Sequence, residues 1–236
     1  MAPPTTLPAP DRAASRPTGR RDHAAVRRAL ATYRGTSLRT RAFVVARYAI
    51  APLGPLTEEL GTLRGRVLSL GSGLGMVERY LAEVNPDISF EGIDLDAEKV
   101  DLIEATRHRS PRVRLVQGDA TDLAGRTGYD AVLVCDALHH FPPATHAGLA
   151  AAIAEALVPG GVCIVKDLDR RPHWKHEWNR VHDRLVAGPE PIACRSLEAM
   201  ARLVARAGLE VERADRTDRA LEPYAHYVLR ARKPLT

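Results

Sequence analysis

The sequence predicts an α/β fold in which a mostly parallel sheet of seven strands has helices on both faces. Two observations lead to this prediction. Short apolar runs alternate with helical patterns through most of the 236 residues, which is typical of parallel strands joined by helices. The last two apolar runs are separated by only a short loop, so they should form an antiparallel hairpin and leave the last strand antiparallel.

The segment before the first strand is predicted to be helical. Residues 1–20 are rich in Pro, Ala, Thr and Arg, and they predict a disordered tail without the apolar stretch of a secretory signal. Helical spacing then recurs over 22–34, 38–50 and 56–62. These helices must pack outside the sheet, over the ligand cleft or along its rim. We therefore interpret 21–62 as an N-terminal helical lid.

The remaining residues, 63–236, should form the sheet domain. The apolar runs predict strands at 66–70, 89–93, 112–117, 130–135, 161–167, 209–215 and 224–232. The helical patterns between them cover 75–84, 96–107, 145–158 and 195–208. A helical insert at about 170–190 interrupts the alternation after the fifth strand.

The composition favours a cytoplasmic protein without a metal site. No apolar run approaches the roughly 18–20 residues that a bilayer span requires. The three cysteines, Cys135, Cys163 and Cys194, have the spacing of neither a disulfide scaffold nor a zinc site. A reducing compartment fits this pattern.

The net charge of +5 is unevenly distributed. Residues 1–48 hold ten Arg and two Asp, whereas the remaining 188 residues hold 24 basic and 27 acidic side chains. The slightly acidic body is therefore not expected to bind nucleic acid. We interpret the basic segment as a solvated arginine-rich helix with its tail, although it could also meet an acidic partner.

A glycine-rich turn follows the first predicted strand. The run VLSLGSGLG places glycines at 71, 73 and 75, and a helical pattern follows it. Such a turn brings backbone N–H groups close to a ligand, although a tight turn can also need glycine for packing alone. Ligands of open parallel sheets bind beyond the carboxyl ends of the strands, so Gly71, Ser72 and Gly73 are candidate binding residues.

Acidic residues end the next two predicted strands. Asp94 lies nineteen residues beyond Gly75, where a carboxylate can accept hydrogen bonds from both hydroxyls of a ribose. Asp96 fits a helix cap better. Asp119 follows the third strand and could accept a bond from an exocyclic amine, or serve as a turn aspartate.

Five segments in this order resemble the motifs of the class I methyltransferases that use S-adenosylmethionine. They are VLSLGSGLG, GIDLD, VQGDATDL, YDAVLVCDALHHF and LVPGGVCIVKD, and the resemblance runs from about Arg66 to the C-terminus. It implies a Rossmann-like fold, with S-adenosylmethionine as cofactor and S-adenosylhomocysteine as product. It also implies a set of cofactor-binding residues, namely Gly71, Ser72, Gly73, Asp94, Leu95, Asp119, Ala120, Cys135 and Asp136.

One position departs from the family's pattern. The family usually has Asp or Glu two residues before the first glycine, where the acid helps to hold the ammonium group of the methionine. Ser69 stands there in this chain. We expect weaker or differently built contacts to the ammonium group, with binding retained. Met76 after the third glycine disfavours a nicotinamide dehydrogenase.

The candidate acceptor residues lie in three places. His139 and His140 follow the fourth strand, near the expected methyl group, and histidine titrates in the range of a general base. In the helical insert, Trp174 and Trp178 could form an apolar wall or simply pack against the sheet. The candidate catalytic residues are His140, His182 and Asp136. The candidate substrate-binding residues are Trp178, Asn179, His182, Tyr48 and Arg47.

These features predict methyl transfer to a small-molecule acceptor, at O, N or C, in a biosynthetic role. One alternative is methylation of RNA or protein, with the basic N-terminal segment as the docking element. Another is a cofactor-binding module without catalysis. The sequence leaves the oligomeric state open, a homodimer included.

Overall fold

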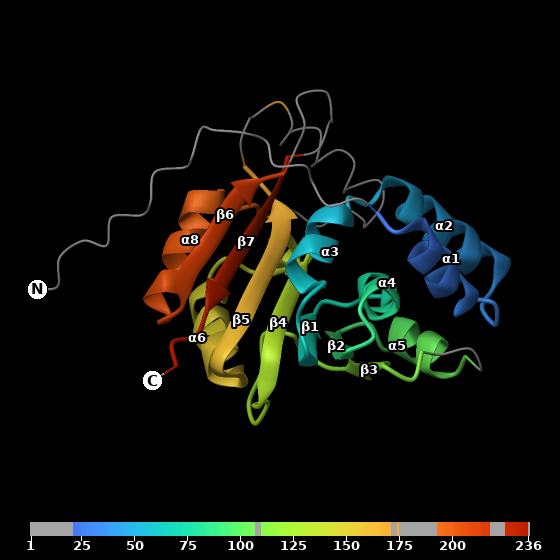
Figure 1. The fold of residues 1–236 in the computed structure, drawn as a ribbon, viewed down its shortest axis with the longest axis horizontal. Helices are drawn as coiled ribbons and strands as arrows, with labels where there is room; N and C mark the ends of the chain where they lie inside the picture. The colour runs from blue at the N-terminus through green and yellow to red at the C-terminus, as the bar shows by residue number, and fades with distance from the viewer. Residues whose placement is uncertain (1–20, 107–109, 171–173, 175–192, 218–224, 236) are drawn as a thin grey trace, which may run out of the picture.

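The structure, a computed structural model, describes residues 21–106, 110–170, 174, 193–217 and 225–235. Seven strands form one sheet in the order β3-β2-β1-β4-β5-β7-β6 (Figure 1). They are β1 (Gly65–Leu70), β2 (Ile88–Asp94), β3 (Val113–Gln117), β4 (Tyr129–Cys135), β5 (Leu157–Leu168), β6 (Glu210–Arg216) and β7 (His226–Arg232).

The strand directions confirm the predicted fold class. Strands β1 to β5 are parallel, and β7 is antiparallel to both β5 and β6. The order reverses beside β1, which pairs with β2 on one side and β4 on the other. Such a reversal leaves a crevice at the carboxyl ends of the strands, where ligands of this architecture bind.

Helices cover both faces of the sheet. On one face lie α6 (His146–Ala156) and α8 (Leu197–Arg206), and on the other lie α4 (Met76–Val84) and α5 (Ala97–Glu104). Side chains of β1 alternate between the two cores. Leu68 and Leu70 join the core under α6 and α8, whereas Val67 faces the core under α4.

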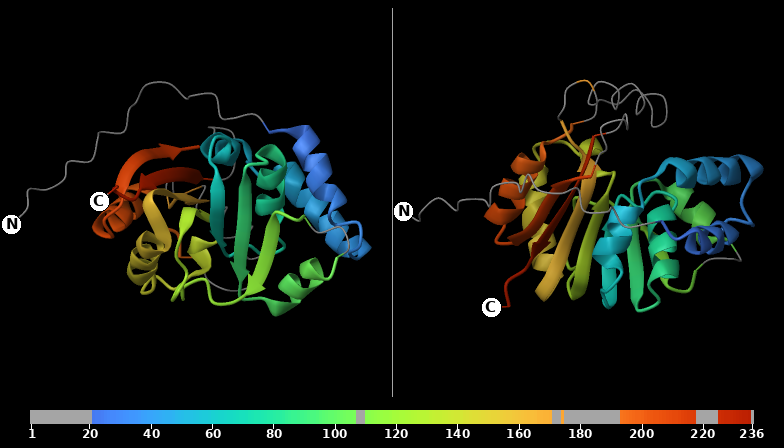
Figure 2. Two further views of the ribbon diagram at one scale, coloured as in Figure 1. Left: turned by 60° about the horizontal axis from the view of Figure 1, so that its bottom comes forward. Right: turned by 45° about the horizontal axis from the view of Figure 1, so that its top comes forward.

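The N-terminal helices pack on the α4 side of the sheet. They are α1 (His23–Ala31), α2 (Leu38–Ile50) and α3 (Gly54–Leu60), and Figure 2 shows α1 and α2 at the opposite end of the molecule from α8. Asp22 caps α1 by accepting hydrogen bonds from two backbone N–H groups. The lid role of this helical unit stays a prediction.

Several boundaries differ from those expected, and α1 and α5 each end three residues early, at Ala31 and Glu104. Strand β5 begins at Leu157, because Leu157 already pairs with Tyr129 and Pro159 cannot continue a helix. Helix α3 begins two residues early, with Pro55 in its first turn. Most of the predicted insert at about 170–190 lies outside the described residues. Only position 170 and Trp174 of this range are described. Among the helices of the described part, none is long and apolar enough to cross a membrane.

Candidate functional site

The turn between β1 and α4 has a backbone that requires glycine. Gly71, Gly73 and Gly75 have φ of 72°, 53° and 66°, a region that side chains with a Cβ atom rarely adopt. A Cβ atom on Gly71 would lie 2.6 Å from the Cβ of Ala137. The N–H groups of Gly71 and Ser72 both donate to the carbonyl of Ile93, which ties the turn to the end of β2.

The carboxylate of Asp94 lies against this turn. Its Oδ2 accepts a hydrogen bond of 2.6 Å from the N–H of Gly73, and its Oδ1 accepts one of 3.0 Å from Asp96. Asp96 caps α5, as predicted, by accepting from the N–H of Lys99. Leu95, between the two acids, is 71% exposed. The structure therefore brings the glycine turn and the predicted ribose acid together at one edge.

Asp119 follows β3 at the same edge of the sheet. Its Oδ1 accepts from the N–H and the hydroxyl of Thr121 at 2.8 and 2.7 Å, and these bonds lower the pKa of Asp119. Ala120 beside it is buried. The turn geometry is thus present, and a bond from Asp119 to an adenine amine stays a prediction.

These residues fit an adenosyl cofactor. The Ser72 hydroxyl is buried and has no hydrogen-bond partner within the described ranges, so a ligand could supply one. The glycine turn leaves bare backbone beside it, and Asp94 retains lone pairs for two hydroxyls. Gly71, Ser72, Gly73 and Asp94 would hold the nucleoside end of such a cofactor.

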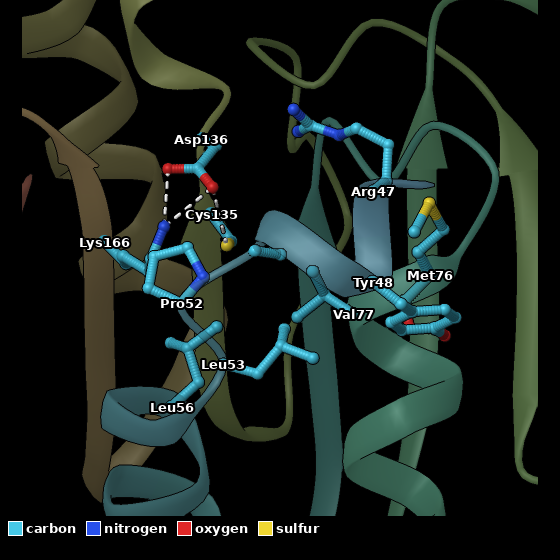
Figure 3. Close-up of a pocket in the computed structure, with 11 residues that line it drawn as sticks. Arg47, Tyr48, Pro52, Leu53, Leu56, Met76, Val77, Cys135, Asp136 and Lys166 are labelled. Carbon is cyan, nitrogen blue, oxygen red and sulfur yellow. Dashed lines mark hydrogen bonds and ion pairs between the residues drawn. The ribbon is translucent and has the colours of Figure 1, made fainter. Parts of the chain in front are cut away.

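A pocket opens next to this edge, between α2, α4 and the ends of β4 and β5 (Figure 3). It combines an apolar wall with charged groups at its rim. Its lining residues are Arg47, Tyr48, Ala51, Pro52, Leu53, Leu56, Met76, Val77, Cys135, Asp136 and Lys166. Two predicted substrate residues and two predicted cofactor residues therefore border one cavity.

Asp136 and Lys166 form an ion pair in this pocket. The buried ammonium of Lys166 donates to both carboxylate oxygens of Asp136, at 2.8 and 2.7 Å. Burial alone would raise the pKa of Asp136, but the charges of Lys166 and His226 more than offset it and hold the pKa well below its usual range. Asp136 is therefore a fixed hydrogen-bond acceptor that stays ionised at neutral pH, rather than a proton store.

Lys166 was not among the residues predicted from the sequence. A lysine inside the apolar run GGVCIVKD could have indicated it, because a charged residue in a buried strand needs a partner. The partner is set by sheet register, since Lys166 pairs with Cys135, the neighbour of Asp136. Asp136 also has a φ of 50°, a left-handed conformation that is uncommon for residues other than glycine and is adopted mainly by Asn, Asp and His.

The two histidines after β4 have different surroundings. His139 is buried, its Nδ1 is bonded to Asp167, and its backbone N–H donates to the same carboxylate at 3.1 Å. A carboxylate on one ring nitrogen fixes the orientation of an imidazole. His140 is exposed on the short helix η1 (Leu138–His140). The structure therefore positions His139 more firmly than the predicted base, His140.

Two tyrosines of the N-terminal segment contact the glycine turn and the start of α4. The hydroxyl of Tyr33 donates to the carbonyl of Leu74 at 2.8 Å, and that of Tyr48 donates to Met76 at 2.6 Å. Burial raises the pKa of both tyrosines. Tyr48 thus fastens α2 to α4 as well as lining the pocket, whereas Arg47 is only partly buried at its rim.

Ser69, which stands where the family usually has an acid, contacts the buried side chain of Glu78. The hydroxyl of Ser69 donates to Oε1 of Glu78 at 2.5 Å. Burial raises the pKa of Glu78 to about 7, although the bond from Ser69 and the charge of Arg79 oppose the rise. Sequence reasoning did not single out Glu78, although its place on the inner face of α4, three residues before Leu81, was a signal.

The structure does not test the predicted residues of the helical insert. Trp178, Asn179 and His182 lie outside the described residues, and Trp174 is 58% exposed. Their roles stay predictions. Among the residues that the structure describes, no three His, Cys, Asp or Glu side chains are placed to hold a metal ion.

Comparison with known proteins agrees with this geometry. Residues 41–214 match the model of a family described as "Methyltransferase domain". Over 121 residues the chain is 27% identical to a ubiquinone biosynthesis O-methyltransferase of Psychrobacter cryohalolentis, covering 49% of this chain and 46% of that protein. The chain thus spans about half the length of the first curated relatives that it matches.

Solved structures share the fold. A SAM-dependent methyltransferase from Methanosarcina mazei matches with a TM-score of 0.61 at 18% identity, over 77% of this chain and 98% of that chain. A structure described by the conversion of a disulfide bond into a thioacetal group during echinomycin biosynthesis matches with a TM-score of 0.60 at 20% identity, over 84% and 93%. With the family model covering most of its length, this chain belongs to the class I S-adenosylmethionine-dependent methyltransferases.

Proposed function

We propose that the protein transfers a methyl group from S-adenosylmethionine to a small-molecule acceptor, at O, N or C, in a biosynthetic role. The observation that carries this proposal is the pocket of Figure 3, which borders the cofactor edge at Cys135 and Asp136. Its other wall is apolar and comes from the segment around Leu53 and Leu56. A concave, mostly apolar pocket with a few polar groups is typical of sites for small molecules.

The chain's own residues account for much of the required positioning. When bound, the cofactor supplies an electrophilic methyl group on a sulfonium, which is a good leaving group, so alignment is the main task of the protein. Asp94 and the glycine turn orient the nucleoside end. Asp136, held ionised by Lys166, accepts a hydrogen bond from a donor in the pocket. Tyr48 and the apolar wall exclude water.

Removal of a proton from the acceptor, where the reaction needs it, falls to a histidine. His140 and His182 are the bases named from the sequence, and both roles stay predictions. His139, which the sequence also places near the expected methyl group, has its ring fixed beside Asp167 and is a further candidate. General-base assistance is typically worth about 10²–10⁴-fold where a hydroxyl must lose its proton.

The named relatives support the same class of acceptor. One is described as acting in ubiquinone biosynthesis and another in echinomycin biosynthesis. Two arginines of the basic segment are engaged within the fold, which leaves fewer of them for docking of RNA or protein. Arg28 pairs with Glu83 at 2.7 Å, and Arg21 donates to the carbonyls of Ala49 and Ala51, so both are engaged within the fold.

The test is transfer of a labelled methyl group. Purified protein is incubated with labelled S-adenosylmethionine and with separate small-molecule, RNA and protein fractions of an extract, and the products are identified by mass. We expect label in a small molecule, and none with the Asp94→Ala variant. Label in RNA or protein, lost steeply with added salt, would overturn the proposed acceptor class. Cofactor binding without transfer to any fraction would favour a binding module.

A further inference from the structure

Ser69 and Glu78 meet directly beneath the glycine turn. Ser69 lies on β1 between Gly92 of β2 and Leu133 of β4, two residues before Gly71. Its side chain is on the α4 face of the sheet, as is that of Val67. Glu78 lies in the first turn of α4, where the helix dipole favours a negative charge. The bond from the serine hydroxyl joins the strand to the helix across the turn.

The carboxylate of Glu78 is only half satisfied. Oε1 accepts the bond from Ser69, but Oε2 is buried and has no hydrogen-bond partner in the part of the chain that the structure describes. The residue as a whole is 2% exposed. A buried carboxylate oxygen without a partner is costly, and such groups are retained where a ligand, ion or water completes them.

The neighbouring cation in the chain, Arg79, does not complete it. Arg79 is fully buried, yet none of its guanidinium nitrogens has a hydrogen-bond partner within the described ranges. Its guanidinium carbon lies 5.2 Å from the centre of the Tyr33 ring instead. Since Arg79 makes no hydrogen bond to Glu78, Oε2 remains available to a cation from outside the fold.

The unpartnered oxygen belongs to the cofactor edge rather than to the protein's periphery. Met76 and Val77, which immediately precede Glu78, line the pocket, and so does Cys135. Ser69, which binds Glu78, lies on β1 beside β4, the strand that ends at Cys135. A ligand in this pocket that carried a primary ammonium group would bring three N–H donors to the place where the acceptor Oε2 of Glu78 lacks a donor.

We propose that Glu78, fixed by Ser69, supplies the negative charge that binds the ammonium group of the cofactor's methionine. This inference rests on the proposed use of S-adenosylmethionine by the protein. It also explains the departure at Ser69, because the charge has moved from the strand to the helix that faces it. An acid at both positions would place two carboxylates in contact, which is unfavourable.

The first test compares two ligands that differ in the ammonium group. S-adenosylhomocysteine carries the amino-acid part, and 5′-methylthioadenosine lacks it. Calorimetry should show that Glu78→Gln weakens binding of S-adenosylhomocysteine by about 10- to 100-fold, as expected for a lost charge-assisted hydrogen bond. Binding of methylthioadenosine should change by no more than about threefold. Glu83→Gln, on the same helix but in a surface ion pair with Arg28, should leave both affinities unchanged.

The second test exchanges the two positions. Ser69→Asp should weaken S-adenosylhomocysteine binding, because it adds a second carboxylate beside Glu78. The double variant Ser69→Asp, Glu78→Gln should regain most of the affinity, because one acid then serves the same place from the strand. Ser69→Ala should show the selective loss in milder form and keeps the inference testable should Glu78→Gln fail to fold.

The outcomes separate this inference from the proposed function. Equal weakening of both ligands by Glu78→Gln, or no weakening of either, would overturn the role of Glu78. Failure of the double variant to recover would do the same. If the unmodified protein bound neither ligand, the proposed use of the cofactor itself would fall.

Discussion

Replacing Glu78 with glutamine should alter how folding stability depends on pH. In the folded protein, burial raises the pKa of Glu78 to about 7, from an ordinary value of 4.5. Between these values the folded state binds more protons at this site than the unfolded state does. Stability is therefore lost as pH rises through this window, and the loss is complete above it.

The size of the effect follows from the same two values. From pH 5 to pH 8 the ionisation of Glu78 should remove roughly 2–3 kcal/mol from the free energy of unfolding. Glutamine does not titrate, so the variant escapes this loss. The stability of the variant relative to the unmodified protein should rise by the same amount over that range. A constant cost of burying the amide group cancels in this double difference.

The assay is urea unfolding of both proteins at several pH values between 5 and 8. The difference also cancels the titration of ionisable groups that do not interact with Glu78. Glu198→Gln is the matched control, because the bond to Arg216 helps to hold the pKa of Glu198 below its usual value despite partial burial. Because Glu198 titrates below this pH range in both the folded and the unfolded state, the relative stability of its variant should stay nearly constant from pH 5 to pH 8. A flat difference for Glu78→Gln would refute the reasoning.

Three further predictions concern the site and its supports. Asp94→Ala should weaken S-adenosylhomocysteine binding by about 100-fold, because the acceptor for the ribose is lost. Asp96→Ala should lower the free energy of unfolding by about 1 kcal/mol through the lost helix cap and should leave the affinity unchanged. Calorimetry that gave the two variants the same affinity would contradict the assignment. Lys166→Met should destabilise the protein by roughly 3 kcal/mol in urea unfolding, because it leaves the buried carboxylate of Asp136 without a counter-charge. Adding Asp136→Asn should recover much of that loss, and additive effects of the two substitutions would disprove the coupling. Gly71→Ala should lower both stability and cofactor affinity, since φ is 72° and the new Cβ meets Ala137, and a melting temperature equal to that of the unmodified protein would argue against this strain.

The site residues that directly follow a strand could be predicted from the sequence. The period of the apolar runs gave the strands to within a few residues, because burial on both faces leaves an unbroken apolar signal. Gly71 and Asp94 followed from rules about strand ends in open sheets. The start of β5 at Leu157 was missed because an apolar strand and the end of an apolar helix look alike over a few residues.

The side-chain pairs of the site could not be predicted in the same way. Lys166 meets Asp136 only because β5 and β4 are in one register, and register is a property of the assembled sheet. Asp167 reaches His139 for the same reason, and this contact changes which of the two histidines is held in place. Glu78 was the nearest miss, because its partner on β1 is only nine positions away in the chain.

The position of β7 in the sheet determines the order in which the protein can assemble. Because β7 lies between β5 and β6, β6 can join the sheet only after β7 has been synthesised. During synthesis the twelve-residue β5 therefore waits with one side unpaired until His226–Arg232 has left the ribosome. A chain interrupted before that point would lose two strands together and would offer a long apolar edge to other nascent chains.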